Sequence, residues 1–116
     1  MESIEVKIAK DYSPTPGPRY IKEGDNSGEL FRQKILFPAL KKALEEKRKI
    51  KVDLDGTAGY GTSFLEESFG GLIRVENMDY KTIMTNLEII SNEEEFLKDD
   101  IEFYLKDADA AKKENK

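Results

Sequence analysis

The sequence predicts a small α/β domain with a mixed or mainly parallel sheet and helices packed on it. Two short segments show the period-two alternation of strands, a third is short and mostly apolar, and amphipathic segments with helical spacing lie between them. Strands that alternate with helices form such sheets through right-handed crossover connections. The chain has 116 residues, enough for one modest core. We expect a single domain over residues 1–106 and a disordered tail over residues 107–116, where no side chain is both apolar and larger than alanine.

The strands are expected at three places in the chain. Apolar and charged side chains alternate over residues 3–9, and again over residues 50–54, while residues 87–90 form a short apolar run. Segment 10–24 contains three of the four prolines, which predicts a surface loop or hairpin. A short strand over residues 19–22 is an open alternative within that loop.

The first helix is expected to begin near Ser27. Asn26 and Glu29 have the spacing of a capping box, in which the Asn side chain accepts from free amides and the Glu side chain reaches back. Pro38 lies within the helical pattern that follows. Because proline lacks an amide hydrogen and crowds the preceding turn, it predicts a kink or a break into two short helices.

Three further helices are expected. The second covers about residues 63–75, and S-F-L-E at its start is itself a capping box, with Ser63 as cap and Glu66 at the third helical position. Asp79 is expected to cap a short helix that ends at about Asn86. A final amphipathic helix opens at S-N-E-E-E-F, after the third strand.

Composition excludes several classes of function. The net charge of −5, from 24 acidic and 19 basic residues, argues against a nucleic-acid partner. No apolar run approaches the roughly 20 residues that span a bilayer, and the N-terminus lacks the apolar run of a signal peptide, so we expect a cytoplasmic protein without membrane contact. The sequence contains no cysteine and no histidine. We expect neither a metal site nor a cofactor, and any chemistry would come from carboxylates, hydroxyls or lysines.

The segment K-V-D-L-D-G-T-A-G-Y-G-T-S-F-L supports two different hypotheses. Its D-L-D-G-T resembles the first motif of the haloacid dehalogenase superfamily, which implies a magnesium-dependent phosphatase with Asp53 as nucleophile and Asp55 as the proton-transferring group. That chemistry needs no histidine. The superfamily also uses further polar residues at the ends of later strands, and Asp99 and Asp100 instead lie within a helical pattern. The phosphatase is therefore the alternative hypothesis.

The leading hypothesis comes from three longer matches. E-G-D-N-S-G-E-L-F-R, I-K-V-D-L-D-G-T and T-S-F-L-E-E-S-F-G-G-L-I-R together resemble the STAS-like domain family of unknown function, which is related to the STAS domains of bacterial anti-sigma factor antagonists. The resemblance covers about residues 22–74 and extends more loosely to Lys106. It implies a STAS-like fold and a non-catalytic signalling domain that binds another protein. It also implies a partner of the histidine-kinase-type ATPase class.

The resemblance places a regulatory phosphoacceptor at Ser63, with Thr62 as its neighbour. In the antagonists the matching segment is D-S-S-G-L, so Gly61 stands here in place of the aspartate and Phe64 in place of the glycine. Added phosphate would change what docks on the loop and the helix. A purely capping role for Ser63 stays open beside the regulatory one.

Partner-binding residues are expected in the glycine-rich loop, on the polar side of the following helix and in a second loop that relatives place nearby. They are Asp55, Gly56, Thr57, Gly59, Tyr60, Gly61, Glu66, Glu67, Gly70 and Arg74, with Asp25, Asn26 and Ser27 from the second loop. Gly70 and Gly71 each cost a helix about 1 kcal/mol relative to alanine. Close packing within the fold and close approach by a partner both remain open explanations. A third hypothesis is a small-ligand or nucleotide sensor that uses the glycine-rich loop to cradle an anion.

Overall fold

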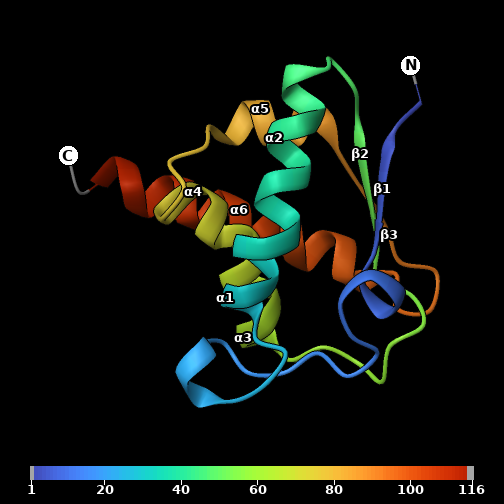
Figure 1. Cartoon of the computed structure of the whole chain (residues 1–116). Coiled ribbons are helices and arrows are strands. Elements are labelled where there is room, and N and C mark those ends of the chain that lie inside the picture. Colours follow the sequence, from blue (N-terminus) through green and yellow to red (C-terminus); the bar gives the residue numbers. More distant parts are fainter. Residues whose placement is uncertain (1, 115–116) are drawn as a thin grey trace.

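The computed structural model describes residues 2–114, which form a three-stranded sheet with the helices on one of its faces (Figure 1). Strands β1 (Ile4–Lys7), β2 (Ile50–Asp53) and β3 (Leu87–Ile90) lie in the order β1-β2-β3. Both strand pairs are parallel. The predicted α/β class and the three predicted strands are confirmed, and each crossover carries helices, as parallel strands require.

The two faces of the sheet differ sharply in polarity. Val6 and Val52, paired in register, are buried beneath the helices. The neighbouring register row consists of Glu5, Lys51 and Glu88 on the other face, where the two glutamates are exposed. The alternation in the sequence therefore separates a core face from a charged face, as the period of a strand dictates.

Helix 28–45 is one continuous rod with an irregular middle. It consists of α1 (Gly28–Phe31), a π-helical turn (Arg32–Leu36) and α2 (Phe37–Glu45). The helix predicted to kink or break at Pro38 does not break: it continues, and this wider turn lies just before the proline. A π-helical turn just before the proline gives its ring room and absorbs the missing amide.

The start of helix 28–45 lies one residue away from the predicted cap. Ser27 is the N-cap, and its hydroxyl accepts from the Leu30 amide at 3.0 Å. The predicted capping box is therefore wrong: Asn26 has a left-handed backbone (φ 60°), and the Glu29 carboxylate accepts from the Ile21 amide instead. A residue in that backbone conformation turns the chain before the helix and leaves the capping position to its neighbour.

Helix 62–74 has the same composite build. α3 (Thr62–Leu65), a π-helical turn (Glu66–Gly70) and α4 (Gly71–Arg74) follow one another without a gap. Its N-cap is Gly61, with φ −80° and ψ 151°, and no side chain caps this end. Ser63 is thus inside the first turn, and its predicted role as cap is wrong because the helix begins before it.

Two later helices complete the layer. Asp79 caps α5 (Tyr80–Asn86) by accepting from the Thr82 amide at 3.1 Å, as predicted. α6 (Phe96–Glu114) runs past Lys106, where a tail was expected. Ala108 is buried, and the Lys112 ammonium donates to the Ile73 carbonyl at 3.2 Å. The tail prediction is wrong over residues 107–114, because alanine is small enough to pack closely against α4, and residues 115–116 lie outside the described residues.

Residues 13–27 form an irregular segment that we call the strap. It passes beneath the starts of α1 and α3 in Figure 1, and its one regular turn is a 3-10 helix at Ile21–Glu23, so the alternative short strand over residues 19–22 is wrong. The carbonyls of Pro18 and Arg19 accept from the first amides of α1, at 2.9 and 3.0 Å. The strap therefore satisfies free amides of the helix that a side-chain cap alone would leave open.

Among the described residues, no helix combines the length and the apolar character needed to cross a membrane.

Candidate functional site

The loop after β2 is held in place by its own carboxylates. Asp55 accepts from the backbone amides of Asn92 and Glu93, both at 2.9 Å, and Glu93 in turn accepts from the Gly56 amide at 2.7 Å. Asp53 accepts from the Asp55 amide at 2.9 Å. The hydrogen bond from the Glu93 amide, followed by those from Asn92, lowers the pKa of Asp55. The two loops that follow β2 and β3 are thereby clasped together at the carboxyl edge of the sheet.

This arrangement does not favour the phosphatase hypothesis. In that hypothesis Asp53 attacks phosphorus, and Asp55 must be free to transfer a proton. Both oxygens of Asp55 accept hydrogen bonds from the neighbouring loop, and Asp53 stabilises the turn that follows its own strand. A strand-end aspartate bonded to an amide two residues on is a common structural device. The second aspartate of the D-L-D-G-T motif therefore holds the loops after β2 and β3 together. We call the hydrogen bonds from the Asn92 and Glu93 amides to Asp55 the Asp55 clasp.

The middle of the glycine-rich loop is anchored on the core. The Tyr60 hydroxyl donates to the Leu54 carbonyl at 2.7 Å, and its ring lies 5.8 Å from that of Phe64. Burial raises the pKa of Tyr60 to about 12. The Thr57 hydroxyl accepts from the Gly59 amide at 3.2 Å. These contacts make Thr57 and Tyr60 supports of the loop.

The last part of the loop and the start of helix 62–74 are open. A Cβ atom built on Gly59 or Gly61 would meet nothing within 4 Å. Thr62 and Ser63 are both exposed. The predicted phosphoacceptor and its neighbour are therefore accessible from solvent.

The second loop reaches the same region through a close helix contact. A Cβ on Gly28 would lie 2.5 Å from the Phe64 carbonyl oxygen, so glycine is required where α1 meets α3. This contact places Gly28, three residues after Asp25, against the backbone of α3. Asp25 is exposed and Asn26 is half-buried, whereas Ser27 is buried as the cap of α1.

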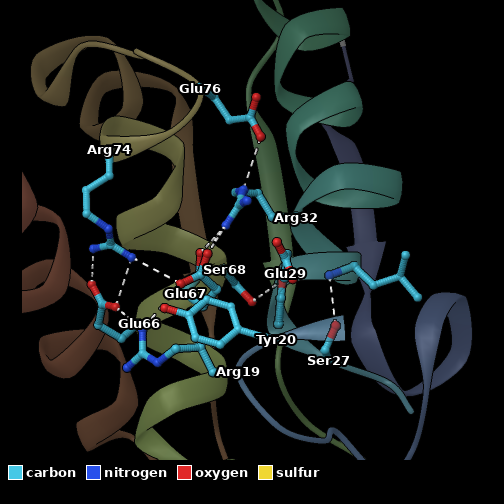
Figure 2. A network of polar contacts seen from close by, with 12 residues as sticks. Arg19, Tyr20, Ser27, Glu29, Arg32, Glu66, Glu67, Ser68, Arg74 and Glu76 are labelled. Atoms are coloured by element: carbon cyan, nitrogen blue, oxygen red, sulfur yellow. Dashed lines mark hydrogen bonds and ion pairs between the residues drawn. The ribbon is translucent and has the colours of Figure 1, made fainter. Parts of the chain in front are cut away.

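Six charged side chains form a network between the strap, helix 28–45 and helix 62–74 (Figure 2). They are Arg19, Arg32, Arg74, Glu66, Glu67 and Glu76. Arg32 forms the inner part, with 1% of its side chain exposed. Its guanidinium donates to the Glu67 carboxylate at 2.6 Å, to the Glu67 carbonyl at 2.8 Å and to the Glu76 carboxylate at 3.1 Å. A buried cation needs such a complete set of partners.

The outer part of the network surrounds Glu66. Arg19 and Arg74 both bind its carboxylate, and each also reaches a Glu67 oxygen at 3.3 Å. Burial alone would raise the pKa of Glu66, but the hydrogen bonds from Arg74 and Arg19 outweigh it and lower the pKa. The outer arginines are 26% and 35% exposed, so this part of the network faces solvent.

The two glycines of helix 62–74 make room for this network. A Cβ on Gly71 would collide with the Arg32 guanidinium, whose Cζ atom would be 2.9 Å away. A Cβ on Gly70 would collide with the Glu66 carboxylate and lie 2.9 Å from an Arg74 nitrogen. Close approach within the fold thus accounts for both glycines.

Three residues predicted to contact a partner lie inside the fold. Glu67, Gly70 and Ser27 are buried, because they serve the ion network and the cap of α1. They do not reach the surface in this conformation. Glu66 and Arg74 are partly exposed and remain at its rim.

The sequence interpretation missed Arg19, Arg32 and Glu76. A signal for Arg32 was present: it lies four residues before Leu36 and eight before Leu40, so it extends the buried stripe of its helix by one turn. An arginine at such a position requires a buried acidic partner. Arg19 and Glu76 belong to loops without periodicity, where no comparable signal exists.

A surface hollow of about 500 Å³ lies beside the network. It is lined by Tyr20, Ile21, Lys22 and Glu29. No residue of the glycine-rich loop contributes to this lining, so the hollow does not provide the anion cradle of the sensor hypothesis.

Comparison with known families identifies a family for more than half of the chain. The model of a family described as a STAS-like domain of unknown function matches residues 27–96, which include the glycine-rich loop and all of helix 62–74. Neither the curated proteins nor the solved structures contain a match to the chain. The matched range leaves out Arg19 and nearly all of α6.

Proposed function

Because the chain belongs to the family of STAS-like domains of unknown function, we propose that it is a non-catalytic interaction domain that binds another protein. Domains of this type are typically non-catalytic. The observation that carries the proposal is the difference between the first and last parts of the glycine-rich loop. Its carboxylates are held by backbone amides, while its last residues and the start of helix 62–74 are open to solvent.

The proposed docking surface is the open end of the glycine-rich loop with the start of helix 62–74 and the tip of the second loop. It consists of Gly56, Gly59, Gly61, Thr62, Ser63, Asp25 and Asn26, with Glu66 and Arg74 at its rim. The rigid support beneath it, from Tyr60 and the Asp55 clasp, favours binding without rearrangement of the backbone.

The proposed partner is an ATPase of the histidine-kinase type, which the relation to anti-sigma factor antagonists suggests. The partner would transfer the γ-phosphoryl group of ATP to the Ser63 oxygen. An O–P bond forms, ADP leaves and the hydroxyl proton passes to solvent. The exposed hydroxyl supports this role, because Ser63 is not engaged as a helix cap. A phosphate of nearly two negative charges at the docking surface would weaken the complex without unfolding the domain.

Two variants of Ser63 test the proposal. Ser63→Ala should keep the free energy of unfolding within about 0.5 kcal/mol, since no cap is lost, and should bind a purified histidine-kinase-type ATPase from the same genome as well as wild type does. Ser63→Asp should bind at least tenfold more weakly. Thr85→Asp, exposed on α5, is the matched control and should bind normally. Binding is measured by calorimetry, and phosphate transfer by radiolabelled ATP.

Two results would contradict the proposal. One is unchanged affinity in Ser63→Asp together with labelling that persists in Ser63→Ala. The other is no measurable binding of wild type to any such ATPase of the genome.

A further inference from the structure

Arg19 joins the strap to the part of helix 62–74 that lies one turn after Ser63. Residues three and four apart in a helix share a face, with about 5–6 Å between their Cβ atoms. Ser63 precedes Glu66 by three residues and Glu67 by four. Both of these carboxylates bind Arg19. Arg19 therefore binds this helix one turn after Ser63.

If Arg19 leaves the outer network, each of its two carboxylates still keeps at least one arginine. Arg19 and Arg74 reach the Glu66 carboxylate from opposite sides in Figure 2, so Glu66 keeps Arg74 when Arg19 leaves. Glu67 likewise keeps the buried Arg32. The Arg19 side chain is 26% exposed, and it can turn toward solvent without opening the core.

The other two arginines are less suited to this role. Arg32 is buried and held by three hydrogen bonds in the space that Gly71 leaves. Arg74 lies three helical turns after Ser63 and binds Glu66 through both of its terminal nitrogens. Arg19 comes from a different segment, and its backbone is fixed by hydrogen bonds of the strap to α1.

We propose that the Arg19 guanidinium leaves Glu66 and Glu67 and binds a phosphate on Ser63. The inference rests on the proposed function, because it requires a phosphate at Ser63. A phosphate carries more charge than one carboxylate and presents three acceptor oxygens to the planar guanidinium, so it competes well for Arg19. Phosphorylation then changes this surface twice: an anion is added, and Arg19 moves from the two carboxylates to the phosphate.

A titration of the phosphate group tests this pairing directly. Phosphoserine is introduced at position 63 during translation, and the second pKa of the phosphate is followed by phosphorus NMR. The charged groups to consider are Glu66, Glu67 and Arg74 on the same helix, and Arg19 and Asp25 on the strap. The carboxylates raise the phosphate pKa, and a bound arginine lowers it.

The expected result is a difference between two backgrounds. The phosphate pKa should be lower by about one unit with Arg19 present than in Arg19→Gln, where Glu66, Glu67 and Arg74 remain. Arg48→Gln is the matched control, because Arg48 binds Glu46 and lies on another segment, and it should leave the phosphate pKa unchanged. Equal phosphate pKa values in wild type and Arg19→Gln, with both proteins folded, would overturn the inference.

This result is independent of partner binding. A phosphate pKa that responds to Arg19 in a protein that binds no ATPase would contradict the proposed function and leave the pairing intact. A phosphate pKa that is the same with and without Arg19, in a protein whose ATPase binding depends on Ser63, would contradict only the pairing of Arg19 with the phosphate.

Discussion

Two acidic pairs lie close together in this sequence, and the fold uses them in opposite ways. Asp53 and Asp55 are satisfied by backbone amides of their own loop and the adjacent one. Glu66 and Glu67 are satisfied by three guanidiniums from the strap, helix 28–45 and helix 62–74. The first pair fixes the shape of a loop. The second fixes how two helices and the strap sit against one another.

The cost of disturbing the two pairs should differ for a physical reason. An ionised group in the interior has given up its hydration, so loss of its partner leaves the desolvation cost uncompensated. A carboxylate at the surface regains water when its hydrogen bonds are lost. The buried half of the ion network should therefore dominate the stability of the domain.

The largest effect is expected for Arg32→Met. It removes the buried cation and leaves Glu67 without its main partner, which should lower the free energy of unfolding by about 3–5 kcal/mol. Arg74→Met is the matched control, with an expected loss of about 1 kcal/mol or less, because Glu66 keeps Arg19. Urea denaturation measures both. Adding Glu67→Met to Arg32→Met should recover much of the loss, and equal losses for the two single variants would contradict the inner and outer division of the network.

A smaller effect is expected at the glycines. Gly71→Ala places a Cβ against the fixed Arg32 guanidinium and should cost about 1–3 kcal/mol. Gly70→Ala meets the partly exposed Glu66 and Arg74 side chains, which can move outward, and the helix propensity of alanine offsets the strain. Thermal and urea denaturation should thus show that Gly71→Ala is clearly less stable than Gly70→Ala. A ranking in the reverse order would show that Arg32 has room to move.

The smallest of these effects is expected for Asp55→Asn, and it should depend on pH. Hydrogen bonds from the Glu93 and Asn92 amides place the pKa of Asp55 below its ordinary value of 3.8. The ionised carboxylate therefore stabilises the fold above that ordinary value, and the contribution disappears as the pH falls through the lower pKa of the folded state. Asp55→Asn should be less stable than wild type at pH 7, and the difference should shrink as the pH falls below 3.8. Urea midpoints over this range measure the difference, and a constant difference would refute the role of the charge.

Elements with a local signal were predictable from the sequence. The alternation of β2 and the apolar run of β3 define strands whatever surrounds them, and Asp79 caps α5 through atoms of its own turn. The glycine-rich loop could be placed at the end of β2 for the same reason. Its openness at Gly59 and Gly61 agrees with the absence of side chains there.

Features that depend on distant residues could not be predicted in this way. Both helix starts were misplaced by a residue, because the backbone conformations of Asn26 and Gly61 decide where each helix begins. The last turns of α6 look polar in the sequence, and only the contact of Ala108 with the core shows that they are packed. Glu67 looked like a surface residue because its partner, Arg32, is on another helix.

The parallel order of the strands also bears on how the chain reaches this structure. Ile4 pairs with Ile50, and Ile50 with Leu87, so no hairpin exists that could form early from neighbouring residues. Long chain segments must close into loops before any two strands can pair. Topologies of this kind fold more slowly than helical bundles of similar size. Helices 28–45 and 62–74 are rich in short-range contacts and are the candidates for the folding nucleus. Until the sheet forms, all three strands are unpaired, which is when the chain is most exposed to aggregation.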